Sequence, residues 1–554
     1  MTAPHELWEV AERATDVLVL GGGIAGYRAA IAARQAGAEV TTAFRAHGAS
    51  PYVLGCNVPI PGPPANDSAE AYYADMLAGG YGLNERRLVR AFTAEAGRAL
   101  DELLAIGVPF ARADGRLLQR HLSGNTHPRS VFVAEGTGPA ILARLRRHAA
   151  AIGIATLEAC SVVALLRDGA EVVGALLYDP RAEALSAVHA RAVVIALGGI
   201  GRLYEDSTYP ADVGAAAYGL ALEAGATLID MEFVQFEPVV TVWPEACRGM
   251  EMPTAMLGDG AVLRNAAGER FMFRYNPQHG ERQIEKARMA LCIQREIDEG
   301  RGLADASVLF DTRSIPRERL ESYVSHCRRL RRAGLDPAIE GPHVRPAAHS
   351  QMGGIAVDAQ GFSGVPGLYA AGEAAGGLHG ASRIAGNGCS DTLIFGAMAG
   401  RGAAAGLAPA GARDRARILA AALRRVREGA GRSPDAPPPA ELRRLISATV
   451  SRAAGIWRNG ADLAAAAARL DALAAPPGAG PAEVSPAAAL EAIGLRHLGW
   501  TAQAIVGAAL LRTESRGAHQ RTDHPRQDDA NWLCHIAFSI GTDGRLSAAR
   551  RPLH

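Results

Sequence analysis

Residues 16–44, which read DVLVLGGGIAGYRAAIAARQAGAEVTTAF, predict how the chain begins to fold. The apolar run Val17–Leu20 is typical of a buried strand, and the glycines after it indicate a tight turn. An alanine-rich helix is expected over 27–36 and a second strand over 39–44. A strand, a glycine turn, a helix and a second strand form the opening unit of a doubly wound α/β sheet.

The turn has the spacing Gly21-x-Gly23-x-x-Gly26. Gly21 would make the tight turn, Gly23 would admit a pyrophosphate, and Gly26 would let the helix pack closely on the strand. Amides at the start of the helix would then bind the phosphates of a dinucleotide. The second strand ends without the acidic residue that holds the ribose of NAD, so the pattern disfavours NAD and is compatible with FAD.

Two further segments place polar side chains among glycines: HSQMGG at 349–354 and LYAAGEAAGGLHGASRIAGNGCSD at 368–391. Glycines let the backbone approach a flat ligand closely, because they have no Cβ atom. The first segment begins with His349, and the second contains Glu373 and Arg383. A histidine and an arginine suit a carboxylate, since a guanidinium can bind both of its oxygens. The pattern predicts a flavin with an acidic substrate over it.

Composition narrows the possible functions. The 554 residues include 58 Lys+Arg and 57 Asp+Glu, so the net charge of +1 gives no global attraction to nucleic acid or membrane. The seven cysteines contain no CxxC pair, which argues against a metal or iron–sulfur site in this chain and fits a reducing compartment. We see no signal peptide and no run long enough to span a bilayer, and we expect a cytoplasmic protein.

The pattern along the chain predicts five segments. We expect a Rossmann-like FAD-binding domain in two parts, 1–236 and 343–404, with an α+β capping domain inserted at 237–342. Residues 405–520 are rich in Ala, Arg and Leu at helical spacing and predict a C-terminal helical domain, followed by a tail at 521–554. In the tail region, arginines and acidic residues predict a structural ion-pair network, formed by Arg512, Glu514, Arg516, Arg521, Asp523, Asp528 and Asp529.

Ordered motifs along nearly the whole chain resemble the flavoprotein family of succinate dehydrogenase, fumarate reductase and L-aspartate oxidase. They are LGGGIAG, GNTHPRSVFVAEGTG, IALGGIGRLY, GATLIDMEFVQF, RNAAGERFM, HSQMGGI, LYAAGE, HGASRIAGNG and ALLRTESRGAHQRTDHPRQDDANW. The resemblance implies the fold and an FAD cofactor, and more weakly the reaction.

The resemblance also implies roles for single residues. Glu373 would bind the ribityl chain, residues 387–390 would lie against the isoalloxazine ring, and His349 and Arg383 would bind the substrate carboxylate. The expected cofactor-binding residues are Gly21, Gly23, Ile24, Ala25, Gly26, Gly198, Gly199, Asp212, Gly372, Glu373, Asn387, Gly388, Cys389 and Ser390. Some family members attach FAD covalently through a histidine near the first glycine helix. Residues 48–57 contain none, so we expect noncovalent FAD.

Three departures from the family pattern concern the chemistry. A substrate-binding histidine is replaced by Glu237, which would repel a dicarboxylate unless it is protonated or paired. The family's TExxRGEG segment aligns either with 253–260, which loses its Glu and Arg, or with 245–249, which keeps Glu245 and Arg248. The proton-relay arginine aligns with Leu291, and Arg288 lies one turn earlier on the same helix face. We therefore take His349, Arg383, Arg288 and Glu237 as the candidate catalytic residues.

These observations predict an FAD-dependent oxidoreductase that transfers a hydride between flavin N5 and a small carboxylate substrate similar to succinate, fumarate or aspartate. One alternative is an adenylylsulfate-reductase-like flavoprotein subunit with an iron–sulfur partner, which needs no carbon-bound proton to move. Another is a non-catalytic electron-transfer subunit. An iron–sulfur or ferredoxin-like partner is possible in each case.

Overall fold

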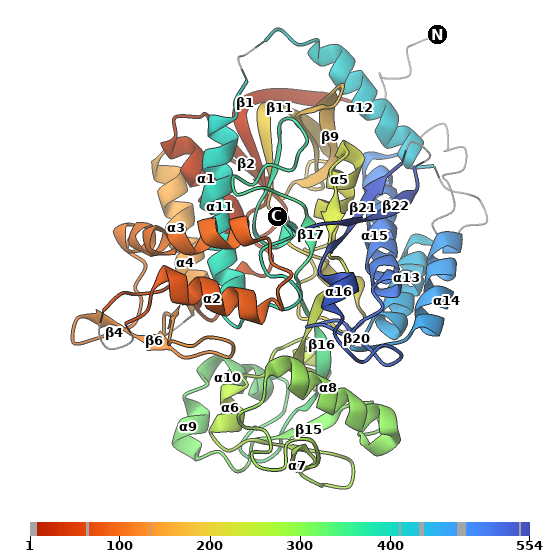
Figure 1. Ribbon diagram of the computed structural model, residues 1–554. Helices are drawn as coiled ribbons and strands as arrows, with labels where there is room; N and C mark the ends of the chain where they lie inside the picture. Colours follow the sequence, from red (N-terminus) through yellow and green to blue (C-terminus); the bar gives the residue numbers. More distant parts are fainter. Residues whose placement is uncertain are drawn as a thin grey trace.

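The computed structural model describes residues 8–62, 66–134, 136–408, 411–431, 437–473, 484–541 and 544–553. Figure 1 shows a large body that contains the central sheet, a smaller domain below it, drawn in green, and a group of C-terminal helices at one side, drawn in blue. The predicted fold class is confirmed: a doubly wound α/β domain carries an inserted α+β domain and a helical C-terminal region.

The central sheet has seven strands in the order β8-β2-β1-β11-β10-β9, with β18 paired to β11. Strands β8, β2, β1, β11 and β18 are parallel, and β9 and β10 continue the sheet in antiparallel pairing. In the middle of the sheet, Val17–Leu20 of β1 and Ala192–Ile195 of β11 are apolar and buried, as expected of parallel strands with both faces covered. The bounds are β1 Val10–Leu20, β2 Val40–Phe44, β8 Ala155–Glu158, β9 Ser161–Asp168, β10 Glu171–Asp179, β11 Ala184–Ile195 and β18 Leu368–Ala370.

Two parallel helices, α1 (Ile24–Gln35) and α11 (Asn387–Ala405), pack side by side against this sheet (Figure 1). Gly396 and Gly400, one turn apart on α11, face the backbone of Ala25 and Ala29 on α1, where a Cβ atom would find no room. The small residues let the two helices touch backbone to backbone. As a result, the two helices run in the same direction, and α11 begins about two turns before α1.

The inserted domain has its own hydrophobic core, whose residues lie between Val239 and Val344. Its antiparallel sheet has the order β13-β16-β15-β14. Strands β13 (Val234–Trp243) and β16 (His343–Gln351) pair with each other and also carry the chain into and out of this domain. The other elements are α6 Ala255–Gly258, β14 Val262–Arg264, α7 Met272–Tyr275, α8 Lys286–Glu296, β15 Val308–Asp311, α9 Arg317–Glu321 and α10 Val324–Arg332.

The remaining helices are α2 Ala69–Gly79, α3 Arg86–Ala105, α4 Thr137–Ala151, α5 Ala216–Ala224, α12 Arg415–Gly429, α13 Pro439–Ala453, α14 Gly460–Leu473, α15 Pro486–Leu511 and α16 Asp529–Trp532. The remaining strands are β3 Cys56–Asn57, β4 Arg112–Ala113, β5 Arg116–Leu117, β6 Gln119–Arg120, β7 Ser130–Val131, β12 Leu228–Ile229, β17 Gly354–Ile355, β19 Trp457–Arg458, β20 Gln520–Arg521, β21 His535–Ile540 and β22 Leu546–Arg551. Among the described helices, none is long and apolar enough to cross a membrane.

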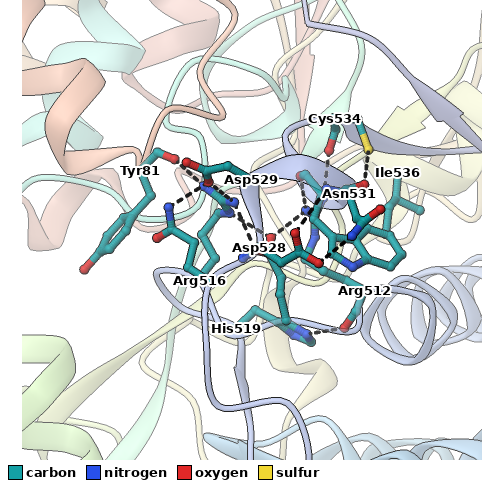
Figure 2. A network of polar contacts seen from close by, with 12 residues as sticks. Tyr81, Arg512, Arg516, His519, Asp528, Asp529, Asn531, Cys534 and Ile536 are labelled. Carbon is teal, nitrogen blue, oxygen red and sulfur yellow. Dashed lines mark hydrogen bonds and ion pairs between the residues drawn. The ribbon is translucent and has the colours of Figure 1, made fainter.

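The predicted ion-pair network near the C-terminus is confirmed except at Asp528, whose carboxylate accepts hydrogen bonds from Asn531. Arg512 and Arg516 are fully buried, and both contact Glu514. Figure 2 shows Arg516 between Asp529 and the carbonyl oxygen of Tyr81, which follows α2 in the body of the molecule. Because a buried charge is costly unless it is paired, this network fixes the tail to the FAD-binding body.

Candidate functional site

The glycine turn after β1 forms a narrow cradle at the start of α1. Gly21 has a φ of +138°, a conformation that favours glycine. A Cβ atom at Gly26 would overlap the carbonyl oxygen of Gly21, so helix and turn are in backbone contact. The helix begins at Ile24 after Gly23, which has no side-chain cap. Amides at this end, including those of Ala25 and Gly26, therefore face a site suited to phosphate.

Glu373 lies on the far side of this cradle, directly after β18. Its carboxylate accepts hydrogen bonds from the hydroxyl of Tyr209 and, at 2.8 Å, from the amide of Gln351. Burial raises the pKa of Glu373. Gly199 has no room for a Cβ atom beside this carboxylate, and Gly198 next to it has a φ of +79°. The glycines keep the Glu373 side chain close to the sheet edge.

The side chain of Asp212 orders a loop at the same edge of the sheet. Its Oδ2 atom accepts a hydrogen bond of 2.9 Å from the amide of Gly48, in the loop after β2. Gly372, which precedes Glu373, has a φ of +63° and no room for a Cβ atom beside Ala25. Both contacts fix loops around the start of α1.

The start of α11 forms a second polar edge. The side-chain oxygen of Asn387 accepts hydrogen bonds from Asn57 at 2.7 Å and from the hydroxyl of Tyr72 at 2.8 Å. Ser390 bonds the backbone of Asn57 through both its acceptor and its donor. The amide nitrogen of the Asn387 side chain is buried without a partner among the described residues. The neighbouring Gly388 and Cys389 complete this first turn of the helix.

The predicted carboxylate ligands lie where the two domains meet. His349 is on β16, and its Nδ1 atom lies 2.9 Å from the hydroxyl of Thr208. Burial lowers the pKa of His349 to about 4, so the imidazole is neutral at pH 7. Arg383 donates a hydrogen bond of 2.9 Å to Gln235, while its Nε atom is buried without a partner in the described chain. The guanidinium is thus oriented but not neutralised by a carboxylate.

Beside this pair lies a cluster of charges. The ammonium group of Lys286, at the start of α8, lies 2.8 and 2.9 Å from the two carboxylate oxygens of Glu237 and 3.3 Å from Glu251. Atoms of Glu237, Glu251 and His349 that could bind a metal lie within 4.8 Å of one another. Lys286 already supplies a cation between the two carboxylates, so the charges need no metal ion for their balance.

The two carboxylates differ in burial. Glu237 is 2% exposed and Glu251 is 26% exposed. Burial, together with the charge of Glu251, raises the pKa of Glu237 to about 7. Burial also opposes ionisation of Glu251, but Lys286 outweighs it and lowers the pKa of Glu251 to about 2. Of the two carboxylates, Glu237 is therefore the one whose ionised form is disfavoured by its surroundings.

Lys286 is the only lysine in the chain. Of the 58 lysine and arginine residues, 57 are arginines. An arginine stays protonated under nearly all conditions, whereas a lysine is a compact ammonium that can lose a proton. The single lysine thus lies between two carboxylates, at the junction of the two domains.

Two sequence-based expectations differ from this arrangement. Arg288 is exposed, and it lies about 200° around α8 from Lys286, so the helix directs it away from the cluster. Glu245 and Arg248 form an exposed ion pair with each other, whereas Glu251, which neither alignment used, lies in the cluster. Sequence reasoning missed Lys286 as well, although the presence of only one lysine was a signal that could have found it.

The residues present fit FAD. The cradle at Gly21 and Gly26 has no space for side chains, α1 begins beside it, and buried polar atoms of Asn387 and Arg383 are left for a ligand. A dinucleotide cradle next to a histidine and an arginine defines an FAD-dependent oxidoreductase.

Comparisons with known proteins agree with this class. A family described as FAD binding domain matches residues 16–389, and one described as fumarate reductase flavoprotein C-term matches residues 443–554. The chain is 33% identical to one of the subunits of fumarate reductase (CoM/CoB) from Methanothermobacter marburgensis, over 92% of this chain and 94% of that protein. It is 32% identical to an L-aspartate oxidase of Streptomyces coelicolor, over 98% of this chain and 94% of that protein.

Among solved structures, quinol fumarate reductase FrdA of E. coli has a TM-score of 0.88 and 27% identity, over 98% of this chain and 97% of that chain. The chain therefore belongs to the flavoprotein family of succinate dehydrogenase, fumarate reductase and L-aspartate oxidase. Its cofactor is FAD, and it is an FAD-dependent oxidoreductase.

Proposed function

We propose that this enzyme transfers a hydride between FAD and a carbon of a small dicarboxylate of the succinate, fumarate or aspartate type. The observation that carries the proposal is the position of His349 and Arg383 beside the Lys286 cluster, at the junction of the two domains. Relatives named fumarate reductase and L-aspartate oxidase support the same substrate class.

His349 and Arg383 would bind one substrate carboxylate. Gln235 bonds Arg383 through both its side-chain oxygen and its side-chain amide, which holds the arginine in one orientation. When Nδ1 of His349 accepts a hydrogen bond from Thr208, Nε2 carries the proton of the neutral ring and can donate it to a substrate oxygen. The two side chains together fix the substrate carbon relative to the flavin.

Lys286 would move the proton that accompanies the hydride. Bound FAD supplies or accepts the hydride at its N5 atom. Although burial lowers the pKa of Lys286, Glu237 and Glu251 outweigh it and raise that pKa. The two carboxylates thus keep Nζ protonated in the resting enzyme, although they also make it a weaker acid, and protonated Glu237 can return a proton to Nζ after Lys286 has given its own to the substrate. This arrangement supports reduction of an unsaturated acid more than oxidation of a saturated one.

The junction would also exclude water. Glu237 on β13 and His349 on β16 lie on the two strands that connect the domains. Movement of the inserted domain toward the FAD-binding body would close the site around the substrate. Closure would strengthen the contacts of Arg383 and Lys286 with an anionic ligand, because charges interact more strongly away from water.

Two further points concern FAD and its electrons. We propose noncovalent FAD, because residues 48–57 contain no histidine and the nearby His47 is engaged, with Nδ1 2.8 Å from the carbonyl oxygen of Gly22. We also propose an iron–sulfur or ferredoxin-like electron-transfer partner, which the names of relatives as subunits support. A self-sufficient oxidase would instead turn over with oxygen alone.

Lys286 favours dicarboxylate chemistry over the sulfur-oxyanion alternative. That alternative rested on the absence of a relay cation at Leu291 and on the loss of the histidine at Glu237. A proton-carrying lysine beside Glu237 is needed when hydrogen is added to carbon, whereas a sulfur substrate requires no such proton. The presence of both His349 and Arg383 argues against a non-catalytic role, because an electron-transfer subunit needs no residues that bind a substrate carboxylate.

The test is an anaerobic flavin spectrum of the purified holoenzyme, titrated with succinate, aspartate, fumarate, malonate and sulfite. We expect fumarate to oxidise the pre-reduced enzyme, and malonate to shift the spectrum of the oxidised enzyme without reaction. A spectrum that responds to sulfite and ignores every dicarboxylate would contradict the proposed function and favour the sulfur-oxyanion alternative.

A further inference from the structure

The charges around Glu237 balance before any substrate is present. Lys286 from α8 and Arg383 from the glycine-rich loop are positive, and Glu237 and Glu251 are negative. His349 on β16 is neutral at pH 7, because burial lowers its pKa to about 4. His326 of α10, which lies against Glu251, also has a pKa lowered by burial. With both carboxylates ionised, the cluster has no net charge to offset a dianion.

A dicarboxylate would therefore bring two uncompensated negative charges into a half-buried site. Such an excess is costly where water is excluded, and a titratable group responds by taking up a proton. We propose that the site binds a dicarboxylate together with one proton, and that Glu237 is the residue that takes up this proton. The inference rests on the proposed function, since it requires a dianion at the clamp formed by His349 and Arg383.

Geometry singles out Glu237 among the groups that could respond. Its side chain is 2% exposed, against 26% for Glu251, so burial disfavours its ionised form more strongly, whereas its contact with Lys286 through both oxygens favours that form. Its pKa, raised by burial and by Glu251 to about 7, leaves it poised to change charge near neutral pH. Lys286 holds the pKa of Glu251 at about 2 despite burial, so Glu251 stays ionised.

Proton uptake by Glu237 would make the affinity of the site for a dianion depend on pH. A protonated Glu237 can donate a hydrogen bond to an anion, whereas the ionised form repels it. Affinity for a dianion then falls as pH rises through 7, by about tenfold per pH unit once Glu237 is ionised in the free enzyme. The proton taken up lies 2.8 Å from Lys286, where it can replace the one that Lys286 gives to substrate.

The direct measurement is calorimetry of malonate binding to the oxidised holoenzyme in buffers of different ionisation enthalpy. At pH 7 we expect uptake of roughly half a proton, and at pH 8.5 uptake approaching one proton. Uptake close to zero at both pH values would overturn the inference while leaving the clamp and the proposed function intact. Failure of malonate to bind at all would overturn the proposed function and this inference with it.

Three variants assign the proton. Glu237→Gln should still bind malonate but lose most of the uptake and the pH dependence of affinity, and any uptake that remains belongs to His349 and His326. Glu251→Gln should still show uptake, but over a lower pH range, because the charge of Glu251 helps to raise the pKa of Glu237. The matched surface control is Glu245→Gln, which removes a carboxylate that is 75% exposed and should behave as the unaltered enzyme. Full uptake in Glu237→Gln, with the flavin spectrum unchanged, would overturn the assignment.

Discussion

The ammonium nitrogen of Lys286 lies 2.8 Å from one carboxylate oxygen of Glu237 and 2.9 Å from the other. Lys286 begins a helix of the inserted domain, and Glu237 lies on the strand that connects the two domains. The contact therefore joins Glu237, which can hold a proton, to Lys286, which can deliver one to the substrate. A residue expected to repel an anionic substrate is thus paired inside the protein, which resolves the objection that Glu237 raised against a dicarboxylate.

Replacement of Lys286 tests its role in proton transfer. We expect Lys286→Gln to lower kcat for reduction of an unsaturated dicarboxylate by about 10²-fold or more, because it removes the acid. Lys286→Arg should recover part of the loss, since it restores a cation between Glu237 and Glu251. Arg295→Gln, which removes an exposed cation from the same helix, should leave kcat unchanged. Stopped-flow reoxidation of reduced flavin measures each rate, and normal turnover in Lys286→Gln would contradict the assignment.

Replacement of Arg383 tests the carboxylate clamp. Arg383→Leu should retain FAD but weaken malonate binding by about 10- to 100-fold, the effect of losing a hydrogen bond to a charged group. The readout is the flavin spectral change on titration. Gln235→Ala should have a smaller effect, because it removes only the group that orients Arg383. A malonate affinity in Arg383→Leu equal to that of the unaltered enzyme would exclude Arg383 as a substrate ligand.

Two glycine substitutions separate the cofactor cradle from helix stability. Gly26→Ala should abolish FAD binding, because the added Cβ atom would overlap the carbonyl oxygen of Gly21. Gly97→Ala, on the exposed side of α3 with open space around it, should raise the free energy of unfolding by about 0.5–1 kcal/mol. The flavin-to-protein ratio and chemical denaturation give the two readouts. An unchanged flavin-to-protein ratio in Gly26→Ala would contradict this prediction and show that the turn can widen to admit the Cβ atom.

His535 predicts a loss of stability in alkaline solution. Its Nδ1 atom lies 2.5 Å from Asp230 and its Nε2 atom 2.8 Å from Glu85. Although burial lowers the pKa of His535, the two carboxylates outweigh it and raise the pKa from 6.5 to about 10. Because the pKa is raised in the folded state, the stabilisation is complete below pH 6.5 and is lost as the pH approaches 10.

The thermal unfolding temperature of the unaltered protein should therefore fall over this pH range. His535→Gln should unfold at a lower temperature at pH 7 and should lose less on going to pH 10. Parallel curves for the two proteins would mean that His535 is not charged in the folded state.

The parts of the molecule that were predictable depend on local sequence. The glycine turn at residues 21–26, the parallel strands and the positions of His349, Glu373 and Arg383 all follow from short motifs whose backbone requirements leave few alternatives. In the inserted domain the one matched motif is RNAAGERFM at 264–272, and the irregular segment between it and α8 leaves the phase of that helix undetermined. A difference of two residues on a helix turns a side chain to the opposite face, which is why the sequence favoured Arg288 over Lys286.

Glu251 was missed for a related reason. It follows the short turn that contains Glu245, and neither alignment of that segment placed an acidic residue at its position. Its role depends on contact with Lys286, 35 positions further along the chain, and thus on tertiary packing rather than on spacing.

The near-absence of lysine has a practical consequence for chemical labelling. Reagents that acylate side-chain amines have a single target in this chain, and it lies between Glu237 and Glu251. Protein grown with isotope-enriched lysine would likewise give one side-chain NMR signal, free of overlap despite the size of the molecule. That signal would follow the protonation of the active site directly, in the presence or absence of turnover.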